Sequence, residues 1–367
     1  MAQKIRLGIL FGGRSCEHEV SVMSARSVLQ AVDKERYEVT MIGISKEGRW
    51  LLAKDALRAL QANEVSDTGA SPVMLNYTAD RGLIALDSIS MEGLAGDIDV
   101  LFPILHGPYG EDGTIQGLFE LAGIAYVGSG VVGSAVGMDK EMMKRAFRGE
   151  GFPQLDYLAL TRKRWRDDPE GLRREIESRF AYPIFVKPRN LGSSVGVSKI
   201  HSTDELTEGM DQAASFDIKI IVEAAAVDCR EVECSVLGND EPRASILGEI
   251  VPGNEFYDYN GKYIDDNSEL IIPARVSAEI SDKVRQLAID AFMAVGAAGM
   301  ARVDFFVGTD NKRIYINEIN TIPGFTPISM YPKLWDATGI GYSELIDQLI
   351  QLALERHQDR QNTRTAL

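Results

Sequence analysis

The sequence has no apolar run long enough to cross a membrane, and it is poor in cysteine. Its longest apolar stretches, such as IKIIV and IYI, are interrupted within a few residues, whereas a membrane helix needs about 20. The three cysteines, Cys16, Cys229 and Cys234, show no metal-ligand spacing and are typical of reduced thiols in the cytoplasm. The opening residues MAQKIRLGILFGG lack a small-residue cleavage site and indicate a first strand. We therefore expect a cytoplasmic protein with no membrane partner.

Positive charge is scarce as well. The formal net charge is −15 at pH 7, which argues against a nucleic-acid partner held through its phosphates. An anionic small molecule could still bind where lysines, arginines and a metal gather locally. The chain has 367 residues, of which 45% are hydrophobic and 25% charged, so it suits two or three packed domains of an ordinary globular protein.

Three common functional motifs are also missing. The phosphate loop GxxxxGK[ST] does not occur, and the GxGxxG fingerprint of dinucleotide-binding proteins is absent after the first strand. His18-Glu19 begins like the HExxH motif of zinc proteases, but position 22 is Val. These absences disfavour a P-loop nucleotidase, a dehydrogenase and a zinc protease.

Hydrophobic periodicity predicts an α/β fold at the N-terminus. Residues 4–11, 38–44 and 97–105 are expected to be buried strands, and residues 16–31 a helix. Such alternation predicts a doubly wound parallel sheet. Beyond it we expect helices at 138–149, 165–180, 277–295 and 341–358, strands at 183–188 and 195–200, further strands from 218 to 251, and a hairpin at 300–320.

The predicted hairpin carries the strongest chemical signal. Side chains on a strand alternate faces, so Arg302 and Asp304 share one face, as do Glu318 and Asn320. Folding about the turn brings Asp304 opposite residues 317–318. Oxygen-only ligands favour a hard cation such as Mg²⁺, which fills its shell with phosphates and water. A solvated polar face on an edge hairpin remains the alternative.

Two further segments could bind a ligand. In PIFVKPRNLGSSVGVSKI, Lys187 ends a strand, and a glycine-serine loop containing Ser193 follows. Its backbone N–H groups could approach phosphates, or it could be an ordinary hairpin turn. Glu17 and His106 each follow a buried strand, the position where open α/β sheets bind ligands. Structural roles at a helix start and in loop packing are equally consistent with the pattern.

Taken together, seven segments resemble the D-alanine–D-alanine ligases of the ATP-grasp superfamily. They are FGGRSCEHEVS, LHGPYGEDGTIQG, GSGVVGSAVGMDK, FVKPRNLGSSVGVSKI, FYDYNGKYIDD, GMARVDFF and NEINTIPGFTPISMYP, in the order of the family. The resemblance implies an N-terminal doubly wound domain (1–128) followed by two ATP-grasp α+β domains (129–222 and 223–367). It also implies a homodimer that joins two D-alanines at the expense of ATP, for peptidoglycan synthesis.

The resemblance also implies roles for individual residues. ATP would contact Lys140, Lys187, Glu223, Ala226, Glu231 and Lys262. Two Mg²⁺ (or Mn²⁺) would be held by Asp304, Glu318 and Asn320. The substrates would contact Glu17, His106, Arg302, Gly324 and Ser329, and the catalytic set would be Glu17, Ser193, Tyr263 and Arg302. Tyr263, on a lid, implies D-alanine rather than D-lactate as the second substrate. An apparent one-residue insertion before Glu231 makes the ribose contact the least secure of these.

Two alternatives remain at this stage. A different carboxylate–amine ligase of the same superfamily would share the phosphate-binding residues, and Glu17, His106, Tyr263 and Ser329 would discriminate it. A nucleotide-binding regulator without catalysis would not need the metal ligands, Arg302 and the lid tyrosine together.

Overall fold

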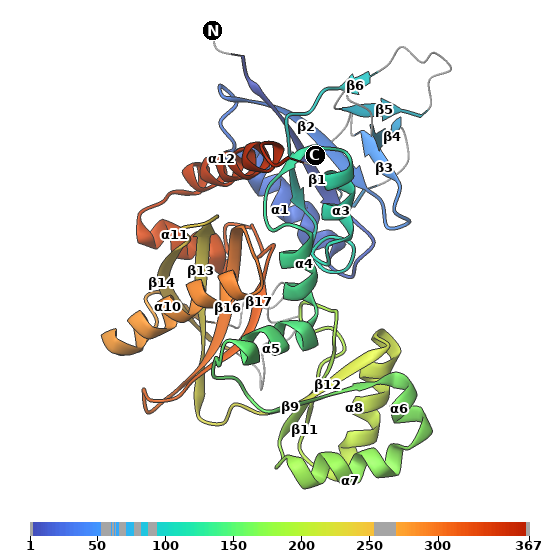
Figure 1. Ribbon diagram of the computed structural model, residues 1–367, viewed down its shortest axis with the longest axis vertical. Helices are drawn as coiled ribbons and strands as arrows, with labels where there is room; N and C mark the ends of the chain where they lie inside the picture. The colour runs from blue at the N-terminus through green and yellow to red at the C-terminus, as the bar shows by residue number, and fades with distance from the viewer. Residues whose placement is uncertain are drawn as a thin grey trace.

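The computed structural model describes residues 3–52, 60, 62, 64–65, 71–76, 82–86, 94–252 and 269–364. Their strands form three sheets, which are spread along the long axis of the molecule (Figure 1). No helix within these ranges is long and apolar enough to cross a bilayer. The first sheet contains the parallel strands and the other two are antiparallel, so the predicted α/β fold followed by two α+β units is confirmed.

The first sheet has eight strands in the order β6-β5-β4-β3-β2-β1-β7-β8. Their bounds are β1 (Ile5–Gly12), β2 (Tyr37–Ile44), β3 (Trp50–Leu52), β4 (Ser71–Leu75), β5 (Leu83–Ala85), β6 (Leu94–Gly96), β7 (Val100–Ile104) and β8 (Ala125–Tyr126). β2, β1, β7 and β8 run parallel, whereas β3 to β6 pair antiparallel. The predicted strands at 4–11, 38–44 and 97–105 are therefore confirmed as β1, β2 and β7.

Helices cover both faces of this sheet. They are α1 (His18–Ala31), α3 (Thr114–Leu121) and α12 (Tyr342–Gln361). Side chains of β1 alternate between two cores, as the pleat of a strand requires. Leu7 and Ile9 join the core under α1 and α12, whereas Leu10 joins the core under α3. The doubly wound arrangement follows from this alternation.

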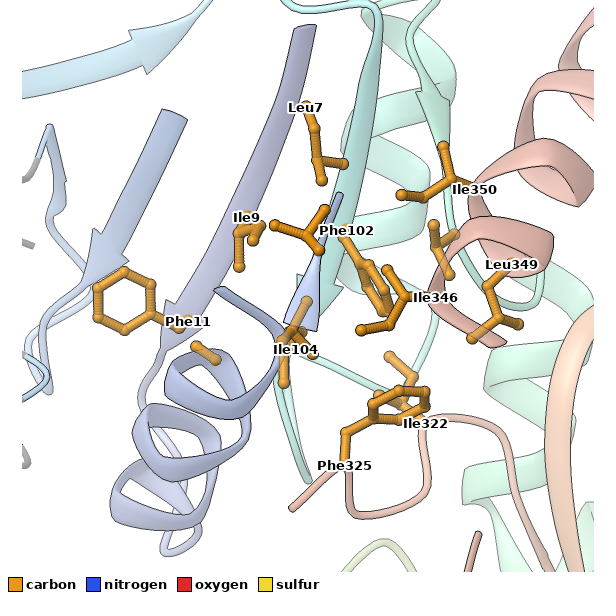
Figure 2. Packing of buried hydrophobic residues seen from close by; sticks show 14 of the residues in the cluster. Leu7, Ile9, Phe11, Phe102, Ile104, Ile322, Phe325, Ile346, Leu349 and Ile350 are labelled. Carbon is orange, nitrogen blue, oxygen red and sulfur yellow. The ribbon is translucent and has the colours of Figure 1, made fainter. Parts of the chain in front are cut away.

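The C-terminal helix α12 belongs to the first core. Leu349 and Ile350 are fully buried and point toward the face of the sheet that carries Phe102 (Figure 2). The Arg356 guanidinium donates a hydrogen bond of 3.0 Å to the backbone carbonyl of Tyr126 at the end of β8. The helix thus lies in the segment that the sequence assigned to the third domain, yet it packs on the first sheet.

The second sheet has four strands in the order β11-β10-β12-β9. Its elements are β9 (Tyr157–Thr161), β10 (Ile184–Pro188), β11 (Ser198–Ile200), β12 (Lys219–Ala224), α6 (Arg162–Asp167), α7 (Pro169–Arg179) and α8 (Thr203–Phe216). The single helix predicted at 165–180 is wrong, because it is divided between α6 and α7. The Asp168 carboxylate accepts the backbone N–H of Gly171 at 2.8 Å, and Pro169 occupies the first helical position, so a new helix begins there.

The third sheet has five strands in the order β15-β14-β13-β16-β17. Its elements are β13 (Cys229–Gly238), β14 (Arg243–Val251), β15 (Glu269–Ile271), β16 (Gly299–Gly308), β17 (Ile314–Asn320), α10 (Ala278–Ala294) and α11 (Met330–Thr338). α10 covers one face, and α11 packs against Ile250 on the other. The hairpin predicted at 300–320 and the helix at 277–295 are confirmed as β16–β17 and α10.

Helices α4 (Val131–Met138) and α5 (Lys140–Gly149) follow the first sheet and pack on the third. Glycines allow α4 to approach very closely. A Cβ added to Gly133 would lie 2.4 Å from the carbonyl oxygen of Gly296, and one added to Gly137 would lie 2.8 Å from Cγ2 of Thr321. Since Thr321 directly follows β17, the position of α4 sets the position of that strand.

Candidate active site

A cleft of about 880 Å³ lies between the second and third sheets. β10 and β12 contribute Lys187 and Glu223, and β13, β16 and β17 contribute Glu231, Asp304 and Glu318. The volume is within the range of small-molecule sites, roughly 300–1,000 Å³. Most of the described residues that the sequence predicts for nucleotide and metal therefore line one cavity, although they lie up to 178 positions apart along the chain, from 140 to 318.

The β16–β17 hairpin presents two carboxylates side by side. Asp304 pairs with Glu318, and Arg302 pairs with Asn320. This register agrees with the one expected from the turn. A bulge after Asp304 leaves Asn317 as an extra residue on β17, which is why the sequence alone could not choose between positions 317 and 318.

The donors on this hairpin fit a hard divalent cation. Asp304 and Glu318 both line the cleft, and the amide nitrogen of Asn320 donates to Asp304 Oδ2 at 3.0 Å. A half-turn of that amide would present its oxygen instead, because the two atoms are interchangeable in shape. No cluster of three His, Cys, Asp or Glu suited to a metal occurs among the described residues. A cation here would complete its shell with the amide, water and ligand phosphates, as Mg²⁺ does.

Arg302 is held between two carboxylates on the same sheet. Its Nε lies 3.1 Å from Glu233 Oε2, and its Nε and terminal nitrogen each donate to an Asp304 oxygen at 2.7 Å. Burial alone would lower the pKa of Arg302, but the charges of Asp304 and Glu233 outweigh it and raise the pKa well above its ordinary value. Arg302 is therefore a fixed cation beside the candidate metal ligands.

At the second-sheet wall, one buried carboxylate receives two ammonium groups. Lys187 Nζ lies 2.6 Å from Glu223 Oε2, and Lys144 Nζ forms an ion pair with Glu223 Oε1. Burial alone would raise the pKa of Glu223, but the charges of Lys144 and Lys187 hold it below its usual range. Sequence reasoning missed Lys144. Its spacing of four residues from Lys140, next to the apolar Met143, was the available signal.

Lys140 connects the glycine-serine loop with the β16–β17 hairpin. Its ammonium donates to the carbonyl oxygen of Leu191 at 2.8 Å and lies 3.4 Å from Glu318 Oε2. Arg189, which opens the loop, pairs with Asp139 at 3.1 Å and with Glu141 at 3.3 Å. Charged contacts with the start of α5 therefore orient this loop over the cleft.

The same loop reaches the first sheet at Glu17. The hydroxyl of Ser193 donates a short hydrogen bond to Glu17 Oε1, across 176 positions of sequence. A Cβ on Gly192 would come within 3.0 Å of Glu17 Oε2, so a glycine is needed for this close approach. The structure thus brings together two members of the predicted catalytic set, and a third, Tyr263, lies outside the described residues.

His106 does not present a free ring nitrogen. Its Nδ1 lies 3.1 Å from the carbonyl oxygen of Ile322, and its Nε2 lies 3.3 Å from Ser24 Oγ. Burial lowers the pKa of His106, so the neutral ring with its proton on Nδ1 fits both contacts. His106 therefore orders the segment after β17 rather than offering a charge to a ligand.

Glu111 binds the backbone of the same residue, Ile322, on its amino side, and sequence reasoning missed it. Its carboxylate accepts the backbone N–H of Gly107 at 2.8 Å and that of Ile322 at 3.0 Å. Burial raises the pKa of Glu111 to about 8, and the neighbouring Glu17 carboxylate adds to the rise. The available signal was the Glu111 side chain within LHGPYGEDG, but the sequence did not show which backbone groups it would bind.

Ser329 and Gly324 lie close together, a few residues after Ile322 along the chain. Ser329 Oγ accepts the Thr326 N–H at 3.1 Å, and it would lie 2.9 Å from a Cβ on Gly324. Ser329 also directly precedes α11. A helix N-terminus with a nearby hydroxyl is suited to a carboxylate ligand. Of the remaining predicted residues, Ala226 lines the cleft, and Lys262 lies outside the described residues.

Comparisons with known proteins agree along almost the whole chain. The family model "D-ala D-ala ligase N-terminus" matches residues 6–129, and "D-ala D-ala ligase C-terminus" matches residues 146–351. A D-alanine–D-alanine ligase of Acetivibrio thermocellus is 49% identical, over 98% of this chain and 98% of that protein. The structure of the D-alanine–D-alanine ligase from Coxiella burnetii superposes with a TM-score of 0.85 at 37% identity, covering 98% and 97% of the two chains. The VanG D-Ala:D-Ser ligase from Enterococcus faecalis gives 0.84 at 34% identity, covering 96% and 100%.

Proposed function

This chain belongs to the D-alanine–D-alanine ligase family, and we propose that it joins two D-alanines at the expense of ATP to supply a peptidoglycan precursor. The observation that carries the proposal is the single cleft lined at one wall by Lys187 and Glu223 and at the other by Asp304 and Glu318. Such a cleft can hold a nucleotide with its base near the second sheet and its terminal phosphates near the hairpin.

In this proposal the γ-phosphoryl group passes to the carboxylate of the first D-alanine, which gives an acyl phosphate and ADP. The amine of the second D-alanine then attacks the acyl carbon, and phosphate leaves. Phosphoryl transfer depends on positioning and charge neutralisation more than on covalent help from the protein. Lys140 and Lys187 supply positive charge at the phosphates, and Glu223, Ala226 and Glu231 line the part of the cleft proposed for adenine and ribose.

Asp304, Glu318 and Asn320 would hold two Mg²⁺ or Mn²⁺ ions. When bound, the ions would neutralise charge on the β- and γ-phosphates. The protein's own cation, Arg302, is fixed by Asp304 and Glu233 next to these ligands. It is suited to stabilise the oxyanion that forms when the second amine attacks.

The substrate end of the proposal uses residues from two sheets. Glu17, oriented by Ser193, would bind the ammonium group of the first D-alanine. The backbone of Gly324 and the hydroxyl of Ser329, at the start of α11, would bind the carboxylate of the second. His106 and Glu111, which follow β7, both contact the backbone of Ile322. Because Ile322 lies just before Gly324, these contacts connect the two proposed subsites.

Tyr263 and Lys262 complete the proposed site from outside the described residues. Tyr263 would join Ser193 and Glu17, and Lys262 would reach the γ-phosphate. Within the family that the sequence resembles, tyrosine here accompanies dipeptide formation and phenylalanine accompanies D-lactate as acceptor. A Tyr263→Phe variant should therefore move preference from an amine toward a hydroxyl acceptor. An unchanged ratio of D-alanine to D-lactate turnover would contradict this assignment.

One coupled assay tests the function as a whole. Phosphate release from ATP should be stimulated by D-alanine and not by L-alanine, with D-alanyl-D-alanine as the product. Stimulation by D-serine with a mixed dipeptide would indicate the acceptor named for the Enterococcus faecalis neighbour. Stimulation by a different acid would indicate another ligase of the superfamily, and ATP binding without turnover would indicate a regulator. We further propose that the protein acts in the cytoplasm as a homodimer, as the family resemblance implies.

A further inference from the structure

Lys144 is a buried lysine that does not line the cleft. It lies on α5, where the neighbouring Met143 and Phe147 belong to the core of the third sheet. Its side chain is 3% exposed, and its ammonium reaches Glu223 on β12 of the second sheet. Glu223 and Lys187 line the cleft, whereas Lys144 lies behind them. The contact of Lys144 with the cleft wall is therefore its ion pair with Glu223, and its charge also acts on Lys187 and Glu318.

The contacts around Glu223 divide its carboxylate between two cations. Oε1 receives Lys144 and Oε2 receives Lys187. Lys144 Nζ also lies 5.4 Å from the centre of the Tyr157 ring, and the structure gives it no other partner among the described residues. Burial lowers the pKa of Lys144 and the charge of Glu223 opposes this shift, so the Lys144 cation depends on an ionised Glu223. Glu318 on β17 acts on both lysines, and Glu231 on β13 acts on Lys187.

Two ammonium groups on one carboxylate leave an excess of one positive charge at this wall. If Lys187 were the only cation paired with Glu223, its positive charge would be balanced by that carboxylate. Because Lys144 already neutralises Glu223 from behind, Lys187 can turn its charge toward a ligand in the cleft. Lys144 thus balances the charge of the Glu223 carboxylate, and Lys187 can contact the nucleotide.

We propose that Lys144 is a positioning residue of the nucleotide site, which keeps Glu223 ionised and oriented so that Glu223 and Lys187 can both contact the nucleotide. This inference rests on the proposed function, since it requires that the cleft binds ATP. It assigns a role to a residue that contacts neither substrate nor metal. A purely structural role, in which Lys144 only fastens α5 to β12, is the competing explanation.

Direct binding of Mg·ADP, measured by titration calorimetry, tests the proposal without requiring turnover. Lys144→Met keeps the length of the side chain and removes its charge, so the dissociation constant for ADP should rise about tenfold, as expected when one hydrogen bond to a charged group is lost through mispositioning. Lys144→Arg keeps the charge and should recover most of the affinity. Arg145→Met is the matched control, since Arg145 is the next residue on α5, is exposed and pairs only with Glu141 among the described residues. Its affinity should equal that of the wild type.

A double-mutant cycle distinguishes a positioning role of Lys144 from a purely structural link between α5 and β12. In a Glu223→Gln background, Lys144→Met should change ADP affinity by less than about twofold, because the group through which it acts is already neutral. The double variant removes Lys144 together with the charge of its partner, and Lys187 is then the remaining cation of the three at this wall. If Lys144→Met costs the same in both backgrounds, the proposal is overturned.

Kinetics and pH give a second readout. In Lys144→Met the KM for ATP should rise while kcat stays within about twofold, the pattern of lost uniform binding. With one cation removed, Glu223 should be protonated at a higher pH, so the KM of the variant should rise further as pH falls, whereas the wild-type KM stays flat. Equal losses in Met and Arg variants without a pH effect would overturn the proposal. A wild-type protein that does not bind ADP would instead contradict the proposed function itself.

Discussion

Replacing Gly133 with alanine should distinguish a packing constraint from ordinary helix propensity. In an exposed helix, Gly→Ala stabilises by about 1 kcal/mol because it reduces the freedom of the unfolded chain. On α4, however, the new Cβ would lie 2.4 Å from the carbonyl oxygen of Gly296, whereas ordinary contacts begin at 3.4 Å. The atoms that it would meet, in Gly296 and Ala297, are all backbone atoms. The helix therefore has to move by roughly 1 Å, and overpacking of this kind costs about 1–3 kcal/mol. The variant should therefore be less stable by up to about 2 kcal/mol, the larger cost minus the propensity gain.

Gly117 on α3 is the matched control, because a Cβ there meets nothing within 4 Å. Gly117→Ala should raise the melting temperature, and Gly133→Ala should lower it. Turnover should also fall in Gly133→Ala alone, since α4 abuts Thr321 at the end of β17, and a displacement of about 1 Å at a catalytic group can cost about a hundredfold in rate. Thermal unfolding and ADP release measure both effects. Wild-type stability and turnover in Gly133→Ala would refute the packing argument.

Three further changes test the proposed site. Asp304→Ala should reduce ADP release about a thousandfold, because the metal that neutralises charge on the terminal phosphates would lose one of its ligands. Near-normal release would contradict the metal assignment. Ser193→Ala removes the donor to Glu17. A hydrogen bond to a charged group contributes about 1.5–3 kcal/mol, so kcat/KM for D-alanine should fall about 10–100-fold. An unchanged kcat/KM would contradict the orienting role of Ser193. For Glu111, the fold raises the pKa from 4.5 to about 8, so the stability it contributes is complete at acid pH and is lost as pH rises through about 8. The free energy of unfolding of the wild type should therefore fall more steeply from pH 4.5 to about pH 8 than that of Glu111→Gln, and parallel curves would be incompatible with this shift.

The sequence predicted best those features that depend on neighbours along the chain. Strand alternation and a tight turn were enough to place Asp304 opposite residues 317–318, because a hairpin register follows from its turn, and the structure selects Glu318. The bulge that follows was not predictable, since it depends on how the hairpin curves within the sheet. The break between α6 and α7 could have been read from Asp168-Pro169, because proline is favoured at the first turn of a helix.

Features that depend on distant segments were not accessible in this way. An amphipathic pattern shows that α12 buries one face, but it does not show that the face packs on the first sheet. Lys144 and Glu111 are charged residues that the sequence would place at the surface by default. Only the fold reveals that their partners are Glu223 and the peptide of Ile322. The proposed role of His106 beside the first subsite likewise stays a prediction, now with the observation that both ring nitrogens are engaged within the protein.

The docking of α12 on the first sheet has a consequence for how the polypeptide matures. During synthesis the first eight strands emerge long before residues 342–361, so α1 covers the hydrophobic side of β1 and β7 only in part until α12 arrives. A nascent chain therefore carries an open apolar surface while the second and third sheets are being made, and chaperones have time to bind it. The sheet that begins to form first is thus completed only after the strands of the other two sheets have left the ribosome.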